Sequence, residues 1–167
     1  LLSAHCTGRE MFNADLRIVD ESGADVGVGG IGEIISRREP MGMIGYINNE
    51  RATREAIVDG WIRTGDLARN EGDGLFTVVD RKKDMLISGA ENVYPKEIEI
   101  VIAEHPEVLE VAVFGIPDPV YGEAVCAAVV ARSPGTLDAE SVVAWCAQRL
   151  ASYKKPKRVE FVGELQR

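Results

Sequence analysis

The chain has 167 residues, of which 46% are hydrophobic and 28% charged, and its formal net charge is −8. This composition suits a globular protein that buries a core, and the negative charge argues against sequence-independent binding to nucleic acid or an anionic membrane. No uninterrupted apolar run is long enough to span a bilayer, so we expect no transmembrane segment. The chain holds three cysteines, an odd number without CxxC spacing, so we expect no disulfide framework or zinc site and place the protein in the reducing cytoplasm.

The first half of the chain is predicted to be rich in β-structure. Alternating apolar residues and turn-prone glycine segments define its strands, and one polar segment has a helical pattern that ends at Asp59-Gly60. The expected elements are strands over 16–19 and Gly32–Arg37, a helix over Glu50–Val58, and a hairpin of Leu67–Arg69 and Leu75–Asp80 around the glycine-containing segment 70–74.

The second half is predicted to be a compact α+β domain with the order strand–helix–strand–strand–helix–strand. Its helices are marked by apolar stripes, and Pro95 suits the first turn of the first helix. The expected elements are strand Met85–Ile87, a helix from Pro95 that stops before Pro106, strands Val108–Gly115 and Ala124–Ala131 joined by a loop over 116–123, a helix through Ala139 and Leu150, and strand Arg158–Val162. Cys126 and Cys146 fall on apolar faces, so we interpret both as small core residues.

A carboxylate follows a glycine in Thr64-Gly65-Asp66, at the edge of a predicted strand. Its two acceptor oxygens can bind both hydroxyls of a ribose, as the acidic residue of a dinucleotide fold does. The plain alternative is a turn aspartate that caps its own backbone. Arg81 is a second candidate, because a planar guanidinium offers fixed donors to phosphate or ribose oxygens. Its alternative is a surface ion pair with Asp80 or Asp84.

Two further segments could meet an anionic ligand. Ser88–Asn92 is predicted to be a loop of small residues between a strand and a helix, where backbone can approach a ligand closely. Its alternative is a simple connector. Tyr153–Arg158 is the basic cluster of the chain, and it could bind phosphates such as those of coenzyme A. Here the alternative is a solvated loop that leads into the last strand.

Taken together, the motifs resemble the adenylate-forming (AMP-binding) superfamily, and within it the acyl-CoA synthetase or fatty-acid–CoA ligase branch. The resemblance extends over nearly the whole chain and is weakest over Leu1–Phe12. The segments that carry it, in family order, are Gly32–Ile35, Gly45-Tyr46, Trp61–Asp66, Asp80–Pro95 and Leu150–Lys157. Several ordered segments are much stronger evidence than any one short motif.

The resemblance implies the β-rich end of a large N-terminal domain over 1–80, a hinge over 81–84 and a small α+β domain over 84–167. That small domain would have a central three-stranded sheet, helices and a short hairpin. The family activates a carboxylic acid with ATP and passes it to coenzyme A, with release of AMP and pyrophosphate. The C-terminal domain rotates between the two half-reactions. The implied cofactors are ATP or AMP, coenzyme A and Mg²⁺, and the implied partner is the rest of the large domain, where most of the Mg²⁺ site belongs.

The resemblance also assigns roles to residues of this chain. Asp66 would hold the adenosine ribose, Arg81 would bind the ribose or a phosphate, and Lys83 would be the hinge residue. The passage for the pantetheine arm of coenzyme A would be lined by Gly89, Ala90, Glu91 and Asn92. Many relatives have Gly-Gly where this chain has Gly89-Ala90, so the alanine methyl narrows the passage.

We assign no catalytic residue and no metal ligand in this chain. The family's adenylation lysine follows a glycine after the last strand, which would lie beyond Arg167, and no Gly-Lys pair occurs here. We therefore expect the chain alone to be inactive as a ligase, and a fatty acid is the substrate that we favour for the whole enzyme. Two alternatives stay open: an amino-acid or aryl-acid adenylating domain that loads a carrier protein, and a non-catalytic binding module.

Overall fold

The structure is a computed structural model that describes residues 6–40 and 42–165. The chain forms two compact units, an N-terminal unit of residues 1–83 and a C-terminal unit of residues 84–167. The division falls between Lys83 and Asp84, inside the segment for which we predict a hinge.

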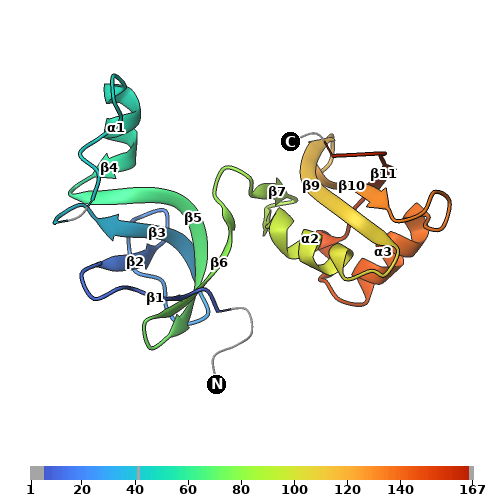
Figure 1. Cartoon of the computed structure of the whole chain (residues 1–167), viewed down its shortest axis with the longest axis horizontal. Coiled ribbons are helices and arrows are strands. Elements are labelled where there is room, and N and C mark those ends of the chain that lie inside the picture. The colour runs from blue at the N-terminus through green and yellow to red at the C-terminus, as the bar shows by residue number, and fades with distance from the viewer. Residues whose placement is uncertain (1–5, 41, 166–167) are drawn as a thin grey trace. The chain divides into compact units, whose positions relative to one another are not determined.

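The N-terminal unit is a six-stranded antiparallel sheet with one short helix. The strands lie in the order β1-β6-β5-β3-β2, and β4 also pairs with β5. The long strand β5 curves along this sheet (Figure 1). The elements are β1 (Gly8–Arg9), β2 (Leu16–Val19), β3 (Ile31–Arg37), α1 (Glu50–Ala56), β4 (Ile57–Val58), β5 (Trp61–Gly72) and β6 (Leu75–Arg81).

Two tight turns set the strand limits in this unit. Asp59 and Gly60 have φ angles of 51° and 81°, and Asp73 and Gly74 have φ angles of 52° and 72°. Consecutive positive φ values define the two-residue turn that best fits the twist of a β-hairpin. The first turn pairs Val58 with Trp61, so the predicted helix over 50–58 is too long by its last two residues. The second lets β5 run to Gly72, where we predicted a loop.

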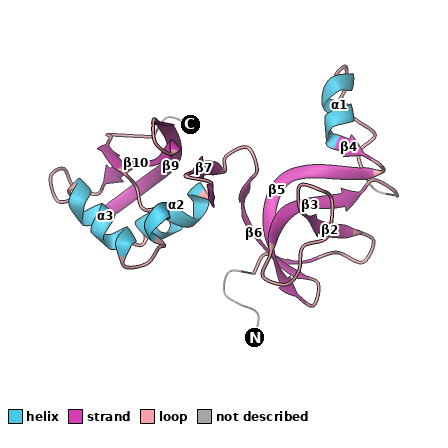
Figure 2. Cartoon of the chain, turned by 180° about the vertical axis from the view of Figure 1, so that it is seen from behind, coloured by secondary structure: helices cyan, strands magenta, loops and turns pink. Residues whose placement is uncertain are grey.

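The C-terminal unit is a five-stranded mixed sheet with two helices packed on one face (Figures 1 and 2). Strand β10 is central, because it pairs with β9 and β7 in antiparallel fashion and with β11 in parallel fashion. The elements are β7 (Leu86–Ser88), β8 (Glu91–Val93), α2 (Pro95–Ala103), β9 (Val108–Asp118), β10 (Gly122–Ala131), α3 (Ala139–Ala147), the 3₁₀ turn η1 (Ser152–Lys154) and β11 (Arg158–Phe161).

The core of this unit lies between β9, β10 and β11 and the two helices. Ile98 and Ile102 of α2 are fully buried against it, as is Cys146 of α3, and Cys126 of β10 is 1% exposed. The prediction that both cysteines are core residues is therefore confirmed. The Trp145 indole N–H donates to the carbonyl of Val101 at 2.8 Å and ties α3 to α2. The predicted α+β class is confirmed, with the hairpin β7–β8 joined to the sheet through the Ser88–Gly122 pair.

Three predicted boundaries in this unit are wrong. The loop expected over 116–123 is a short turn, because the Asp118 carboxylate accepts the backbone N–H groups of Val120 and Tyr121, both at 2.9 Å. The strands therefore extend to Asp118 and begin again at Gly122. Glu91 and Asn92, expected to lie in a loop over Ser88–Asn92, belong to strand β8, and Leu150 lies beyond the end of α3 at Ala147. The described part of the chain contains no helix long and apolar enough to cross a membrane.

Candidate functional site

Asp66 and Arg81 lie opposite each other on the paired strands β5 and β6. The Arg81 Nε atom is 3.1 Å from Asp66 Oδ1, and the two side chains are 56% and 40% exposed. The structure therefore brings the two predicted nucleotide ligands together. Arg81 pairs across the strands with Asp66, whereas its backbone N–H donates to the Asp80 carboxylate at 2.8 Å. The oxygen atoms of the Asp66 carboxylate and the nitrogen atoms of the Arg81 guanidinium remain open to solvent. From one direction, the carboxylate can accept hydrogen bonds from a diol and the guanidinium can donate to a phosphate.

A local break in strand pairing places Asp66 in this position. Gly65 has a φ of 75°, a conformation that glycine adopts without strain, and the β3–β5 register shifts beside it, between Glu33 and Ile35. The Thr64 hydroxyl donates to the Ile34 carbonyl at 2.7 Å and accepts the Asp66 N–H at 3.1 Å. The side chain of Thr64 thus replaces the strand hydrogen bonds that the break removes.

Glu33 is a buried carboxylate beneath this turn, and sequence reasoning missed it. It is 5% exposed. Its Oε2 atom lies 2.9 Å from Arg63 Nη1 and 3.2 Å from Lys82 Nζ, and its Oε1 accepts the Gly65 N–H at 3.2 Å. Burial alone would raise the pKa of Glu33, but the hydrogen bonds and charges of Lys82 and Arg63, with the Gly65 N–H, hold that pKa below its ordinary value. Glu33 is therefore an ionised group at neutral pH.

Lys83, the predicted hinge residue, follows directly after this anchored segment. The Lys82 N–H donates to the Gly65 carbonyl at 2.7 Å, and Lys82 Nζ reaches Glu33, so Lys82 is bound by backbone and side chain. Lys83 and Asp84 form an exposed turn between the two compact units. The hinge role of Lys83 stays a prediction.

In the C-terminal unit, Gly89 and Ala90 form the two-residue turn of the hairpin β7–β8. Their φ angles are 62° and 69°, the conformation that this hairpin turn requires at both positions. An added Cβ on Gly89 would lie 2.8 Å from the Tyr121 ring, and the Gly89 N–H donates to the Tyr121 carbonyl at 3.0 Å. Glu91 and Asn92 follow on β8 and are exposed. The predicted passage residues therefore share one hairpin, which rests against Tyr121.

The basic cluster divides into residues with different partners. Lys154 Nζ lies 2.6 Å from Glu97 Oε2 and is mostly buried, so it fixes η1 to α2. Lys157 Nζ lies 3.3 Å from the centre of the Tyr121 ring and 3.6 Å from Asp118. Among the described residues, the Lys155 ammonium has no hydrogen bond or ion pair. The alternative of a solvated loop is therefore wrong for Lys154, whereas the Lys157 side chain is 44% exposed.

Lys155 and Lys157 line a cavity of about 510 Å³ beside the Gly89–Ala90 turn. Gly89 and Glu91 line it from the hairpin, and Tyr121 forms part of its wall. The Asp118 carboxylate lies 3.6 Å from the Lys157 ammonium. The pKa of Asp118 is lowered by hydrogen bonds from the Tyr121 and Val120 N–H groups and by the Lys157 charge. The cavity thus joins two predicted segments, the small-residue turn and the basic cluster, which are more than sixty residues apart in the sequence.

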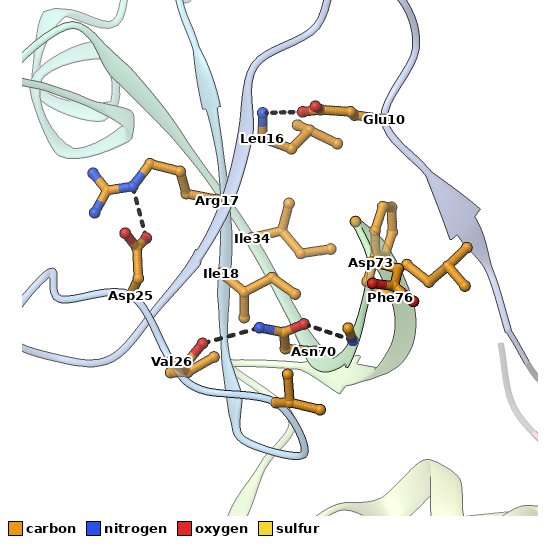
Figure 3. A pocket seen from close by; sticks show the side chains of 14 residues that line it. Glu10, Leu16, Arg17, Ile18, Asp25, Val26, Ile34, Asn70, Asp73 and Phe76 are labelled. Atoms are coloured by element: carbon orange, nitrogen blue, oxygen red, sulfur yellow. Dashed lines mark hydrogen bonds and ion pairs between the residues drawn. The ribbon is translucent and has the colours of Figure 1, made fainter.

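A second hollow lies on the sheet of the N-terminal unit and has a volume of about 410 Å³. Figure 3 shows Ile18 and Ile34, which pair across β2 and β3, at its centre, with Arg17 bonded to Asp25 at its edge. Neither Asp66 nor Arg81 lines it. Three carboxylates also line it: Asp25 is bound to Arg17 at 2.7 Å, Glu10 accepts the Leu16 N–H at 3.0 Å, and Asp73 belongs to the turn between β5 and β6.

Among the described residues, the two buried cysteines are not reactive thiols, and the acidic groups form no metal cluster. Burial raises the pKa of the Cys126 and Cys146 thiols, which keeps them protonated and unreactive at neutral pH. Over residues 6–40 and 42–165, no group of three or more His, Cys, Asp or Glu side chains could hold a metal ion. The residues present therefore do not make a Mg²⁺ site.

Comparison with known proteins agrees with these features. Residues 97–167 match the family model described as the AMP-binding enzyme C-terminal domain. The resemblance of the chain to adenylate-forming enzymes, predicted from its motifs, is confirmed, and the family is one whose members use ATP or AMP and coenzyme A.

The curated relatives include ligases for different acids. The feruloyl-CoA synthase of an Amycolatopsis species is 45% identical over 158 residues, which are 95% of this chain and 32% of that protein. The long-chain-fatty-acid–CoA ligase of Yersinia pestis is 44% identical over 158 residues, which are 95% of this chain and 28% of that protein. The chain thus spans about a third of the length of the curated relatives that it matches.

Solved structures share the fold over nearly the whole chain. The o-succinylbenzoate-CoA synthetase of Bacillus subtilis, in complex with its acyl-adenylate intermediate, matches with a TM-score of 0.91 and 33% identity over 99% of this chain and 33% of that one. The amide bond synthetase McbA of Marinactinospora thermotolerans matches with a TM-score of 0.87 and 39% identity over 97% of this chain and 33% of that one.

The lowered pKa of Glu33 predicts a specific pH dependence of stability. A carboxyl group whose pKa is depressed by folding stabilises the fold above its unfolded pKa of about 4.3, and this contribution is lost as the pH falls through the folded pKa. We expect Glu33→Gln to lower the free energy of unfolding of the N-terminal unit by about 1–3 kcal/mol at pH 7. This difference from wild type should shrink towards zero below about pH 4.

The measurement is urea unfolding followed by Trp61 fluorescence in a Trp145→Phe background, across pH 3 to 8. The exposed Glu55, which pairs with Arg51 on α1, provides the control, and Glu55→Gln should change stability little at any pH. A difference for Glu33→Gln that stays constant or grows as the pH falls would contradict the assignment.

The hairpin turn predicts opposite effects for two adjacent substitutions. Gly89→Ala forces a side chain into a left-handed conformation and against the Tyr121 ring, so we expect a loss of about 1–3 kcal/mol in stability of the C-terminal unit. Ala90→Gly relieves the same kind of strain without removing a buried contact, and should leave stability unchanged or raise it by up to about 1 kcal/mol. Unfolding followed by Trp145 fluorescence in a Trp61→Phe background measures both. Equal effects of the two changes would show that the turn is not strained as described.

Proposed function

We propose that the chain is part of an ATP-dependent, AMP-forming acid–thiol ligase that makes acyl- or aryl-CoA. In the first half-reaction the carboxylate of the acid attacks the α-phosphorus of ATP, and pyrophosphate leaves. In the second, the thiol of coenzyme A attacks the carbonyl of the acyl-adenylate, and AMP leaves with the electron pair of the broken bond. The family match and the ligase activities in the relatives' names support this proposal.

Asp66 and Arg81 are the proposed ligands for the adenosine part of the nucleotide. Asp66 would accept hydrogen bonds from the two ribose hydroxyls, and Arg81, 3.1 Å from it, would donate to a ribose oxygen or to the α-phosphate. The ion pair between them holds both side chains in place before the ligand arrives, which reduces the entropy lost on binding.

Lys83 is the proposed hinge residue. It lies at the end of the N-terminal unit and follows Lys82, whose backbone and side chain are both bound. A hinge works where a few residues absorb a change in φ and ψ while the chain on either side stays rigid. Its position supports the idea that the C-terminal unit turns about this point between the two half-reactions.

The basic cavity beside the Gly89–Ala90 turn is the observation that favours coenzyme A as the acceptor. Coenzyme A has a neutral pantetheine arm and a phosphorylated nucleotide. We propose that the exposed hairpin residues Gly89, Ala90, Glu91 and Asn92 line the passage for the arm. The Lys155 and Lys157 ammonium groups in the adjoining cavity would bind the phosphates.

The identity of the carboxylic acid that the enzyme activates is a separate part of the proposal. We favour a fatty acid on the family resemblance, although relatives of similar identity are named for ferulate and for long-chain fatty acids. A second candidate function is amide bond formation, in which an amine attacks the adenylate, and the likeness to an amide bond synthetase favours it. Loading of a carrier protein and a purely binding role are the remaining alternatives.

The test of this function is an assay of the full-length protein against a panel of short, long and aromatic acids. Each acid is incubated with ATP and with coenzyme A, a primary amine or a phosphopantetheinylated carrier protein, and the products are identified by mass spectrometry. Acyl- or aryl-CoA as the main product supports the proposal. An amide, a loaded carrier protein or no AMP release with any acid would overturn it.

The proposed phosphate contact predicts a selective defect in coenzyme A use. In the full-length enzyme, Lys155→Ala should raise KM for coenzyme A by about fivefold, because an exposed charge-assisted contact contributes about 1 kcal/mol, with kcat little changed. KM for pantetheine, which lacks the phosphates, should stay the same.

Arg158→Ala is the matched control for this prediction. It removes the same charge three residues further along, but Arg158 pairs with Glu160 and does not line the cavity. Its KM for coenzyme A should therefore equal that of wild type within twofold, as expected for a group outside the binding site. An equal rise for both variants, or a rise with pantetheine as well, would contradict the phosphate role of Lys155.

A further inference from the structure

Glu33 carries its charge in a buried position, where a charged group is unfavourable unless partners compensate for the lost water. It lies on β3 with Ile34 and Ile35, which are 8% and 6% exposed, and is itself 5% exposed. A carboxylate that loses its water must recover the lost solvation from charged and hydrogen-bonding partners. An apolar residue of similar volume often serves stability at least as well. The partners of Glu33 therefore indicate what the charge is for.

The three partners of Glu33 come from two segments of the N-terminal unit, strand β5 and the residues after β6. Arg63 precedes the break in β5, Gly65 is the residue in the break, and Lys82 follows the end of β6. Both carboxylate oxygens are used, Oε1 by the Gly65 N–H and Oε2 by the two cations. One side chain thus joins the segment that carries Asp66 to the segment that carries Arg81 and leads to Lys83.

The backbone around Gly65 is held on both sides by this arrangement. Its N–H donates to Glu33, and its carbonyl accepts the Lys82 N–H at 2.7 Å. The next residue is Asp66, whose own N–H donates to the Thr64 hydroxyl. The direction of the Asp66 carboxylate follows from the orientation of these peptide groups. A shift of the Glu33 carboxylate would therefore move the Gly65 peptide groups, and with them Asp66 and its ion pair with Arg81.

We infer that Glu33 is a positioning residue for nucleotide binding, which acts through Gly65 and Lys82 and does not touch the nucleotide itself. It aligns Asp66 with Arg81, and it fixes Lys82 so that free rotation of the chain begins at Lys83. This inference rests on the proposed function, because it assigns Asp66 and Arg81 to the nucleotide. The competing explanation is a purely structural ion pair, which would affect stability alone.

The first test is a double-mutant cycle on AMP binding by the full-length protein, measured by calorimetry. We expect Glu33→Gln to weaken AMP binding by about five- to tenfold, which corresponds to about 1–1.4 kcal/mol. In an Asp66→Asn background the same change should have little further effect, because residues that act through one another are not additive. Phe76→Ala is the control for stability, since Phe76 is a half-buried residue of the same unit that pairs with Gly8 and Asn70 and has no link to Glu33 or Gly65. It should lower stability and leave AMP affinity unchanged.

The outcomes separate this inference from the proposed function. Additive effects of Glu33→Gln and Asp66→Asn, or an equal loss of affinity in Phe76→Ala, would overturn the positioning role. Failure of the wild-type protein to bind AMP would instead overturn the nucleotide assignment on which the inference rests.

The second test uses the 167-residue chain and does not depend on nucleotide binding. Trypsin must take a lysine side chain into its specificity pocket, so the Glu33–Lys82 pair protects the bond after Lys82 more than the bond after Lys83. We expect Glu33→Gln, and equally Glu33→Asp, which shortens the reach to Lys82, to raise the ratio of cleavage after Lys82 to cleavage after Lys83 at least threefold. Mass spectrometry of the fragments measures this ratio, and Phe76→Ala should not change it. An unchanged ratio in both Glu33 variants would show that Lys82 is not fixed by Glu33.

Discussion

The buried carboxylate of Glu33 is the constraint on which the N-terminal unit's candidate site depends. It binds one backbone N–H and two cations that belong to segments far apart in the sequence. Because every one of these donors would lose a buried partner if the carboxylate moved, the broken strand pairing at Gly65 has one stable arrangement. The geometry of the exposed pair of Asp66 and Arg81 is therefore set by Glu33, a group that solvent hardly reaches.

Tight turns with consecutive positive φ angles fix the ends of strands in both units. Asp59-Gly60 and Asp73-Gly74 end strands in the N-terminal unit, and Gly89-Ala90 does so in the C-terminal unit. The first two pairs are the residue types that such turns prefer, whereas the alanine of the third accepts a conformation that costs about 1 kcal/mol or more. The strain at Ala90 is stored where the proposed passage for coenzyme A begins, in keeping with the tendency of strained backbone to occur at functional sites.

The sequence predicted the elements better than it predicted the contacts between them. Alternation and apolar stripes are local signals, so the longer strands, the three helices and the core role of Cys126 and Cys146 followed from them, whereas the short strands β1, β4 and β8 did not. The limits at Asp118 and at Val58 were missed because they depend on a side-chain hydrogen bond and on a turn type. Glu33 was missed because its partners lie 30, 32 and 49 positions away. A charged residue within the apolar run of β3 was the one signal that could have revealed it.

The pairing of strand β11 determines the order in which the sheet of the C-terminal unit can form. It is the last strand of the sheet, and it pairs in parallel with Cys126–Val129 of the central strand β10, after a crossover through α3. A parallel pair of this kind cannot form until the whole connection has been synthesised, and such non-local contacts are slow to close. During translation, β10 therefore emerges with an open edge made of apolar residues, and it stays open until Arg158–Phe161 leaves the ribosome. This interval is the period in which the unit is most exposed to mispairing with another chain.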